Sequence, residues 1–225
     1  MLTMKEETQR LIRAAYIPML WVFTLWAIKG LEWLSGARFD FMGVYPRSID
    51  GLAGIALAPL EHADLAHLFN NSVPLLILGT SLFYFYREIA VKIIILVWLT
   101  TGLCVWIGGR MAIHIGASGI IYGFASFLFF SGLIRKNVKL IAISLLTVFL
   151  YGGLIWGVFP IWPELSWESH LFGGLSGSIF AFIYADEGPQ KEEPDWGEDE
   201  NEDEDPYWKL NEDETETNKT SNSAE

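Results

Sequence analysis

The sequence predicts an all-α polytopic membrane protein with six transmembrane helices. Hydrophobic residues make up 52% of the 225 residues, and ten Trp and fifteen Phe are among them. They gather in runs of roughly 18 to 22 residues, which is the length that a helix needs to cross a hydrocarbon core of about 30 Å. We therefore expect the chain to lie in a lipid bilayer, without a nucleic acid partner. Nothing in the sequence indicates a particular oligomeric state.

The apolar runs define one helical domain over residues 16–185. Its predicted spans are 16–36, 66–86, 91–109, 117–134, 139–159 and 168–185. The first span follows a short charged segment, residues 1–15, and has no small-residue cleavage site behind it, so we expect it to be retained and not removed as a signal peptide. Lys29 and Glu32 lie one turn apart near its outer end, where they can snorkel or pair.

The basic residues beside the spans predict the orientation of the chain. Eight lie on the side of the amino terminus: Lys5, Arg10, Arg13, Arg87, Lys92, Arg135, Lys136 and Lys139. Four lie on the other side: Lys29, Arg38, Arg47 and Arg110. Because cytoplasmic loops are enriched in Lys and Arg, both termini are expected in the cytoplasm. The expected location is the plasma (inner) membrane of a prokaryote.

Residues 186–225 differ in composition from the rest of the chain. They hold seventeen acidic residues and only three lysines. An acidic segment of low hydrophobicity cannot bury enough apolar surface to fold, so we expect a disordered cytoplasmic tail. Its apolar cluster, residues 206–210, is a candidate docking motif.

Cysteine and histidine spacing indicates neither a metal site nor a cofactor. Cys104 is the single cysteine, and the four histidines lack metal-ligand spacing. Two of them, His62 and His114, fall in predicted loops near the outer surface, where the ordinary expectation is no chemical role.

The polar residues of three spans are predicted to share one depth. With the amino terminus inside, spans 66–86, 117–134 and 168–185 run from outside to inside, and each carries its unusual polar residues in its first two turns. These residues are His67 with Asn71, Ser118, and His170. Polar side chains at membrane depth are costly and usually mark a functional site. A serine with a histidine is the minimal pair for an activated nucleophile.

Helical spacing places hydrogen-bond donors on one face of the second span. His67 and Asn71 are four residues apart, so they lie on the same face, and both can donate. Donors of this kind can bind the oxyanion of a tetrahedral acyl intermediate. The backbone N–H of Ser118 is another candidate, because amides at the start of a helix are unpaired.

The same spacing predicts how the fourth and sixth spans meet. Tyr122 lies one turn deeper than Ser118, where it can wall or stack on His170. On the sixth span, His170, Gly173 and Gly177 form one stripe, and small residues at that spacing let two membrane helices approach closely. A direct Ser118–His170 hydrogen bond requires such an approach.

Each residue also has a structural interpretation. Ser118 and the glycines can serve helix packing, a membrane histidine can bond to a carbonyl, and Tyr122 can be an interfacial aromatic. Their conjunction at one depth favours a functional site.

The same residues carry a resemblance to a known family. The strings are His67-Leu68-Phe69-Asn70-Asn71, then Gly116-Ala117-Ser118-Gly119 with Tyr122, then His170 with Gly173 and Gly177. In this combination, with six spans over residues 16–185, the chain resembles the rhomboids, a family of intramembrane serine proteases. The resemblance implies a six-helix rhomboid-like bundle that cleaves transmembrane segments of other membrane proteins as a serine endopeptidase.

The resemblance also implies roles for individual residues. Ser118 would be the nucleophile and His170 the general base, while His67, Asn71 and the Ser118 amide would bind the oxyanion. The supporting residues would be Gly116, Tyr122, Gly173 and His62. Neither span 117–134 nor span 168–185 contains an acidic residue, apart from Glu168 at the entrance of the second of them. A Ser–His dyad is therefore expected.

Two other classes compete with a protease. A non-catalytic rhomboid-like protein that binds membrane helices is expected to lack the Ser or the His. A transporter or channel would place its polar groups near the midplane and would often show inverted repeats. For lateral entry of a substrate, span 139–159 and the loop after it, which are rich in Gly, Pro and aromatic residues, are candidates for gate and lid.

Overall fold

The structure of the chain is a computed structural model that describes residues 4–150, 156–161 and 165–188. Its main helices are α1 (Met4–Ser35), α3 (Leu65–Phe85), α4 (Ala90–Gly108), α5 (Ser118–Ile134), α6 (Val138–Leu150) and α8 (Trp167–Ile183). Three short helices, η1 (Asp40–Met42), α2 (Gly54–Leu57) and η2 (Ala58–Leu60), lie between α1 and α3. The described residues form no strand, and their one isolated β-bridge joins Val44 to His114. The predicted all-α class is confirmed for this part of the chain.

The six main helices correspond in order to the six predicted spans. Three of them, α1, α3 and α4, are long and apolar enough to cross a membrane. Helices α5 and α6 are apolar but shorter. The chain is thus a membrane protein, and the count of six crossings stays a prediction. Residues 151–155 of the predicted fifth span lie outside the described residues, as do residues 189–225 of the predicted tail.

Helix α1 extends beyond the predicted first span at its amino end. The span was predicted to start at residue 16, and the helix begins at Met4. The added turns are rich in Glu, Arg and Lys, which are good helix formers in water. The hydropathy pattern marks where the apolar part of a helix starts, whereas the helix itself continues through the charged residues before it.

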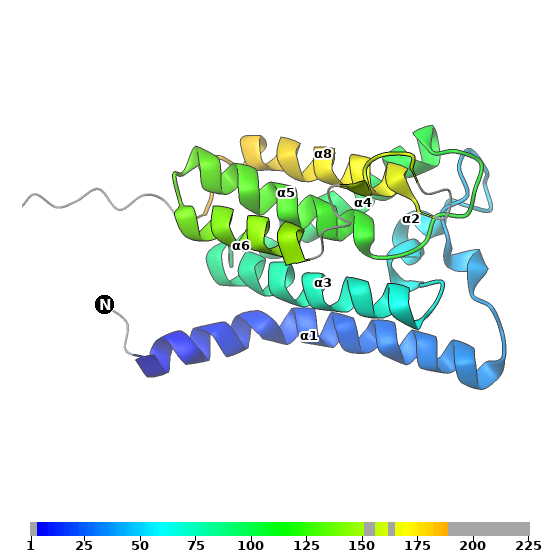
Figure 1. Cartoon of the computed structure of the whole chain (residues 1–225), viewed down its shortest axis with the longest axis horizontal. Helices are drawn as coiled ribbons and strands as arrows, with labels where there is room; N and C mark the ends of the chain where they lie inside the picture. The colour runs from blue at the N-terminus through cyan, green and yellow to red at the C-terminus, as the bar shows by residue number, and fades with distance from the viewer. Residues whose placement is uncertain (1–3, 151–155, 162–164, 189–225) are drawn as a thin grey trace, which may run out of the picture. The chain divides into compact units, whose positions relative to one another are not determined.

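Consecutive main helices run in opposite directions, so that α3, α5 and α8 begin at the same end of the bundle, on the right of Figure 1. The loops between α1 and α3 and between α4 and α5 lie at this end too. The residues at the starts of α3, α5 and α8 therefore lie at one end of the bundle, in agreement with the shared depth predicted from the sequence.

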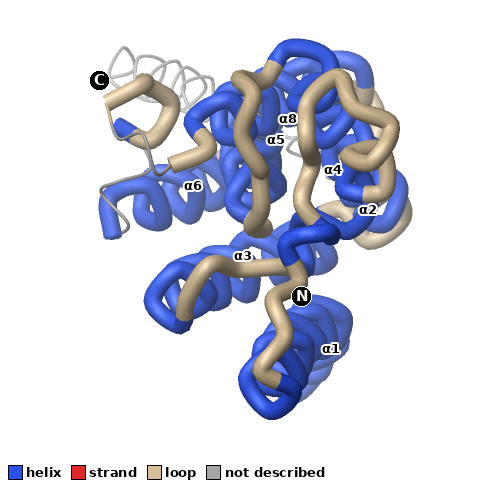
Figure 2. Tube along the Cα trace, turned by 90° about the vertical axis from the view of Figure 1, so that its right-hand side faces the viewer, coloured by secondary structure: helices blue, strands red, loops and turns tan. Residues whose placement is uncertain are grey.

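The core packs around α5. Figure 2 shows the helices end-on, with α1 beside α3 and α5 beside α8. Aromatic packing joins α1 to α4, since the rings of Trp21 and Trp98 stack with their centroids 5.0 Å apart. Helix α1 also approaches α3 closely, because a Cβ on Gly79 would lie 3.1 Å from the ring of Pro18. These contacts hold α1 against both α3 and α4.

Candidate active site

Ser118 is the first residue of α5. Two residues earlier, Gly116 has a φ of +106°, a backbone conformation that L side chains rarely adopt, and its N–H donates to the Ala58 carbonyl at 2.9 Å. This turn starts α5 at Ser118 without a side-chain cap. Among the described residues, the Ser118 N–H has no acceptor, as expected for the first turn of a helix.

His170 lies in the first turn of α8 and faces Ser118. Its Nε2 is 2.7 Å from Ser118 Oγ, and its Nδ1 is 2.8 Å from the carbonyl oxygen of Gly157. Because a carbonyl oxygen can only accept, Nδ1 carries the proton and donates it. Nε2 then has a free lone pair and accepts from the Ser118 hydroxyl. This is the tautomer and orientation that a general base for a serine requires.

Tyr122 covers one face of the His170 ring. The two rings are nearly parallel, at 8°, with their centroids 4.3 Å apart. The spacing of Ser118 and Tyr122 predicted this stack, which is confirmed. Tyr122 thereby restricts rotation of the imidazole away from Ser118.

Glycines set the distance between α5 and α8. A Cβ on Gly173 would lie 1.9 Å from the Gly119 carbonyl oxygen, and one on Gly177 would lie 1.9 Å from the Gly123 carbonyl oxygen. Both distances are far below any real Cβ contact. The predicted stripe of small residues is therefore where the helices touch, and it brings Ser118 and His170 within hydrogen-bond distance.

His67 and Asn71 approach the segment that leads into Ser118. Asp64 caps α3 by accepting a 2.7 Å hydrogen bond from the His67 N–H. A Cβ on Gly116 would lie 2.8 Å from the His67 ring and 3.7 Å from Asn71 Nδ2. Asn71 is buried, and its Nδ2 has no hydrogen-bond partner within the described part of the chain. A buried donor without an acceptor costs free energy, so it is a natural place for a ligand oxygen.

His62 lies behind this segment. It is 1% exposed, its Nε2 lies 3.4 Å from the Ala117 N–H that donates to it, and its ring contacts that of His67 edge-on with centroids 5.0 Å apart. Burial lowers its pKa from 6.5 to about 3, with the charges of His67 and Lys29 adding to the effect. His62 is thus neutral, as acceptance of a hydrogen bond at Nε2 requires. The loop position predicted for it is confirmed, but the side chain is buried.

A polar network that the sequence did not predict anchors the start of α8. The His114 Nε2 lies 3.1 Å from the Arg110 carbonyl oxygen, so it carries the proton, and Nδ1 accepts from Ser166 Oγ at 2.5 Å. Ser166 in turn bonds Ser169, the neighbour of His170, at 2.6 Å. His114 does lie in a loop, as predicted, but it is 2% exposed and burial lowers its pKa. Ser166 and Ser169, which come shortly before His170 in the sequence, could have indicated this network.

An ion pair supports the same turn of α8. Glu168 is 2% exposed and pairs with Arg110 at 3.7 Å. The described residues contain no group of three or more His, Cys, Asp or Glu that could hold a metal ion.

The comparisons with known proteins assign the family. The family model of the Rhomboid domain matches residues 50–187. The uncharacterized protein Rv1337 of Mycobacterium tuberculosis is 34% identical over 174 residues, which cover 73% of this chain and 72% of that protein. The uncharacterized protein ML1171 of Mycobacterium leprae is 31% identical over 192 residues, which cover 80% and 76% of the two chains. The family match includes the starts of α3, α5 and α8, and on these grounds the chain belongs to the rhomboid family.

Proposed function

We propose that this rhomboid protein is an intramembrane serine endopeptidase with a Ser118–His170 dyad. The observation that carries the proposal is the 2.7 Å contact between Ser118 Oγ and His170 Nε2, with Nδ1 bound to the Gly157 carbonyl. A histidine that only packed in a helix bundle would not need both nitrogens fixed in the order that a general base requires.

In the proposed reaction, Ser118 Oγ attacks the scissile carbonyl while His170 Nε2 takes the hydroxyl proton. The tetrahedral intermediate carries its negative charge on an oxygen beside the start of α5, where the Ser118 N–H and the Asn71 amide can donate to it. His67 would be a further donor. His170 then gives its proton to the leaving amine, and a water molecule hydrolyses the acyl-enzyme by the same steps.

The Gly157 carbonyl takes the place that an aspartate has in a catalytic triad. It fixes the tautomer of His170 but has no full negative charge, so it stabilises the imidazolium less than a carboxylate would. Among the described residues, no acidic side chain bonds to either ring nitrogen of His170. A dyad is therefore the form of the site that these contacts support.

The proposed substrates are transmembrane segments of other proteins. A helix satisfies its carbonyls internally, so a cleavable segment must unwind locally, which helix-weakening residues near the cut favour. We also propose six crossings, with both termini in the cytoplasm of a prokaryote, because the main helices alternate in direction and basic residues are more numerous at the side of the amino terminus.

The test is cleavage of a model transmembrane substrate by the purified protein in liposomes, together with labelling by a fluorophosphonate. Ser118→Ala and His170→Ala should abolish both, since removal of either residue in a soluble serine protease costs on the order of 10⁶-fold in kcat. Ser126→Ala is the matched control, because this serine lies on the same helix and its hydroxyl donates to the Gly123 carbonyl, one turn back on that helix. A folded wild type that neither cleaves nor labels would contradict the proposal and favour a non-catalytic, helix-binding protein.

A further inference from the structure

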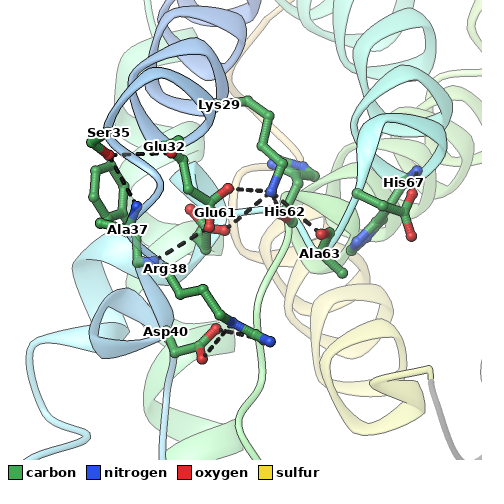
Figure 3. A network of polar contacts seen from close by, with 12 residues as sticks. Lys29, Glu32, Ser35, Ala37, Arg38, Asp40, Glu61, His62, Ala63 and His67 are labelled. Carbon is green, nitrogen blue, oxygen red and sulfur yellow. Dashed lines mark hydrogen bonds and ion pairs between the residues drawn. The ribbon is translucent and has the colours of Figure 1, made fainter.

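Lys29 lies near the end of α1 and makes polar contacts with a loop far along the chain. Its Nζ donates to the His62 carbonyl at 2.6 Å and to the Ala63 carbonyl at 3.3 Å (Figure 3). It forms an ion pair with Glu32 and lies 3.7 Å from a carboxylate oxygen of Glu61. One ammonium thus joins α1 to three consecutive residues of the segment between η2 and α3.

In the loop over residues 61–64, the His62 and Ala63 carbonyls depend on a donor from outside the loop. The loop starts where η2 ends and stops at Asp64, the N-cap of α3, so neither helix supplies acceptors or donors to its middle. An ammonium has three N–H donors and no acceptor, which suits a site with two carbonyls and carboxylates. The side chain of Lys29 is only 16% exposed, so water has little access to donate these hydrogen bonds in its place.

The same loop contacts the segment that leads into Ser118. The His62 ring accepts from the Ala117 N–H, and the Ala58 carbonyl accepts from the Gly116 N–H. His62 also packs against the ring of His67. A shift of the His62 backbone would therefore move the ring that contacts the Ala117 amide and the His67 ring.

The charges around Lys29 make its role specific. Glu61 is 2% exposed, and one of its carboxylate oxygens has no partner among the described residues. Burial, with the nearby charge of Glu32, raises the pKa of Glu61. Without Lys29, two carboxylates would face each other and two carbonyls would lose their donor, so the loop would move.

We propose that Lys29 is a positioning residue for the proposed active site: its ammonium holds the His62 and Ala63 carbonyls and so keeps the His62 ring against Ala117, the residue before Ser118. The assignment deepens the proposed protease function and rests on it. Lys29 does not touch the reacting atoms and acts through His62.

The first test compares Lys29→Met with Lys29→Arg, which keeps the charge and the donors. The number of reactive serines is counted by exhaustive fluorophosphonate labelling, and kcat is expressed per labelled site. Lys29→Met should lower this kcat by about 10- to 100-fold with KM nearly unchanged, because a displacement near 1 Å is that costly. Lys29→Arg should restore most of the lost rate.

Lys92→Met is the matched control for loss of a lysine at the edge of the bundle. Lys92 also pairs with a glutamate, Glu187, at 3.5 Å, but its side chain is 49% exposed, and its ammonium lies over the ring of Tyr184, after the end of α8. It should keep the wild-type kcat. If Lys29 only stabilised the fold, fewer sites would label but kcat per labelled site would not change, and this result would overturn the proposal.

Hydrogen exchange followed by mass spectrometry tests the contact itself, whether or not the protein cleaves. In Lys29→Met, amides of residues 61–67 and of Ala117 should exchange at least about tenfold faster, while those of α4 should not change. Unchanged exchange in both segments would overturn the proposal even in an active enzyme. If the wild type neither cleaves nor labels, but Lys29→Met exchanges faster than the wild type in these two segments, the proposed protease function is wrong and the contact of Lys29 is supported.

Discussion

Substitution of Gly173 by alanine should separate Ser118 from His170. A Cβ at this position would lie 1.9 Å from the Gly119 carbonyl oxygen, whereas real Cβ atoms essentially never come within 3.0 Å of such a neighbour. Because the obstacle is backbone, α5 and α8 must move apart by about 1.1 Å at this point. The 2.7 Å contact between Ser118 Oγ and His170 Nε2 then lengthens toward about 3.8 Å, beyond hydrogen-bond distance.

The expected result is a fall in kcat of about 100-fold, the usual cost of displacing reacting groups by 1 Å. Gly174→Ala is the matched control on the adjacent residue, since a Cβ there meets no atom within 4 Å. Cleavage of one transmembrane substrate and thermal unfolding are measured for both variants in the same liposomes. Equal kcat for the two variants, at equal fractions of folded protein, would refute the claim that these glycines set the dyad distance.

Two further predictions concern His62 and Tyr122. His62 has a pKa of about 3 in the folded protein against 6.5 for a free histidine, so the unfolded chain binds more protons between these values. Its contribution to stability, at most about 5 kcal/mol, is complete above pH 6.5 and is lost as the pH falls toward 3. The melting temperature should therefore decline less steeply with acid in His62→Gln than in the wild type, and parallel declines would contradict this account. Removal of the ring in Tyr122→Ala should lower kcat roughly 2- to 12-fold, because a ring stack contributes a free energy of about 0.5 to 1.5 kcal/mol. Tyr122→Phe keeps the stack on His170, so its kcat should remain near that of the wild type. Steady-state kinetics of both variants test this prediction.

The positions of the helices follow from local patterns that the sequence contains. Apolar runs predicted where α3, α4, α5 and α8 lie to within about two residues, because burial in lipid requires a continuous run. Helix α1 itself begins at Met4, before the predicted span, because charged helix formers extend it outside the apolar run. Patterns of hydropathy therefore locate the apolar part of a helix better than they locate its ends.

Some contacts of the site were predicted from the sequence and others were not. The spacing of Ser118 and Tyr122 within one helix, and the glycine stripe on another, predicted the ring stack and the close helix contact that the structure contains. The contacts of Lys29 with the loop before α3 were missed. The sequence indicated that Lys29 can pair with Glu32 one turn away, but its bonds to the His62 and Ala63 carbonyls join positions more than thirty residues apart. No periodicity encodes such a loop contact.

The caps of the helices show where the fold leaves donors for a ligand. Helix α3 begins with a side-chain cap, Asp64, whose carboxylate accepts from the His67 N–H. Helix α5 begins after Ala117, which has no side chain that could cap it, although a capping residue there would contribute about 1 kcal/mol of stability. The positive end of the α5 dipole and the Ser118 amide are thus left for an outside acceptor. A negative oxygen formed beside Ser118 would be that acceptor, and so the missing cap fits catalysis better than it fits packing.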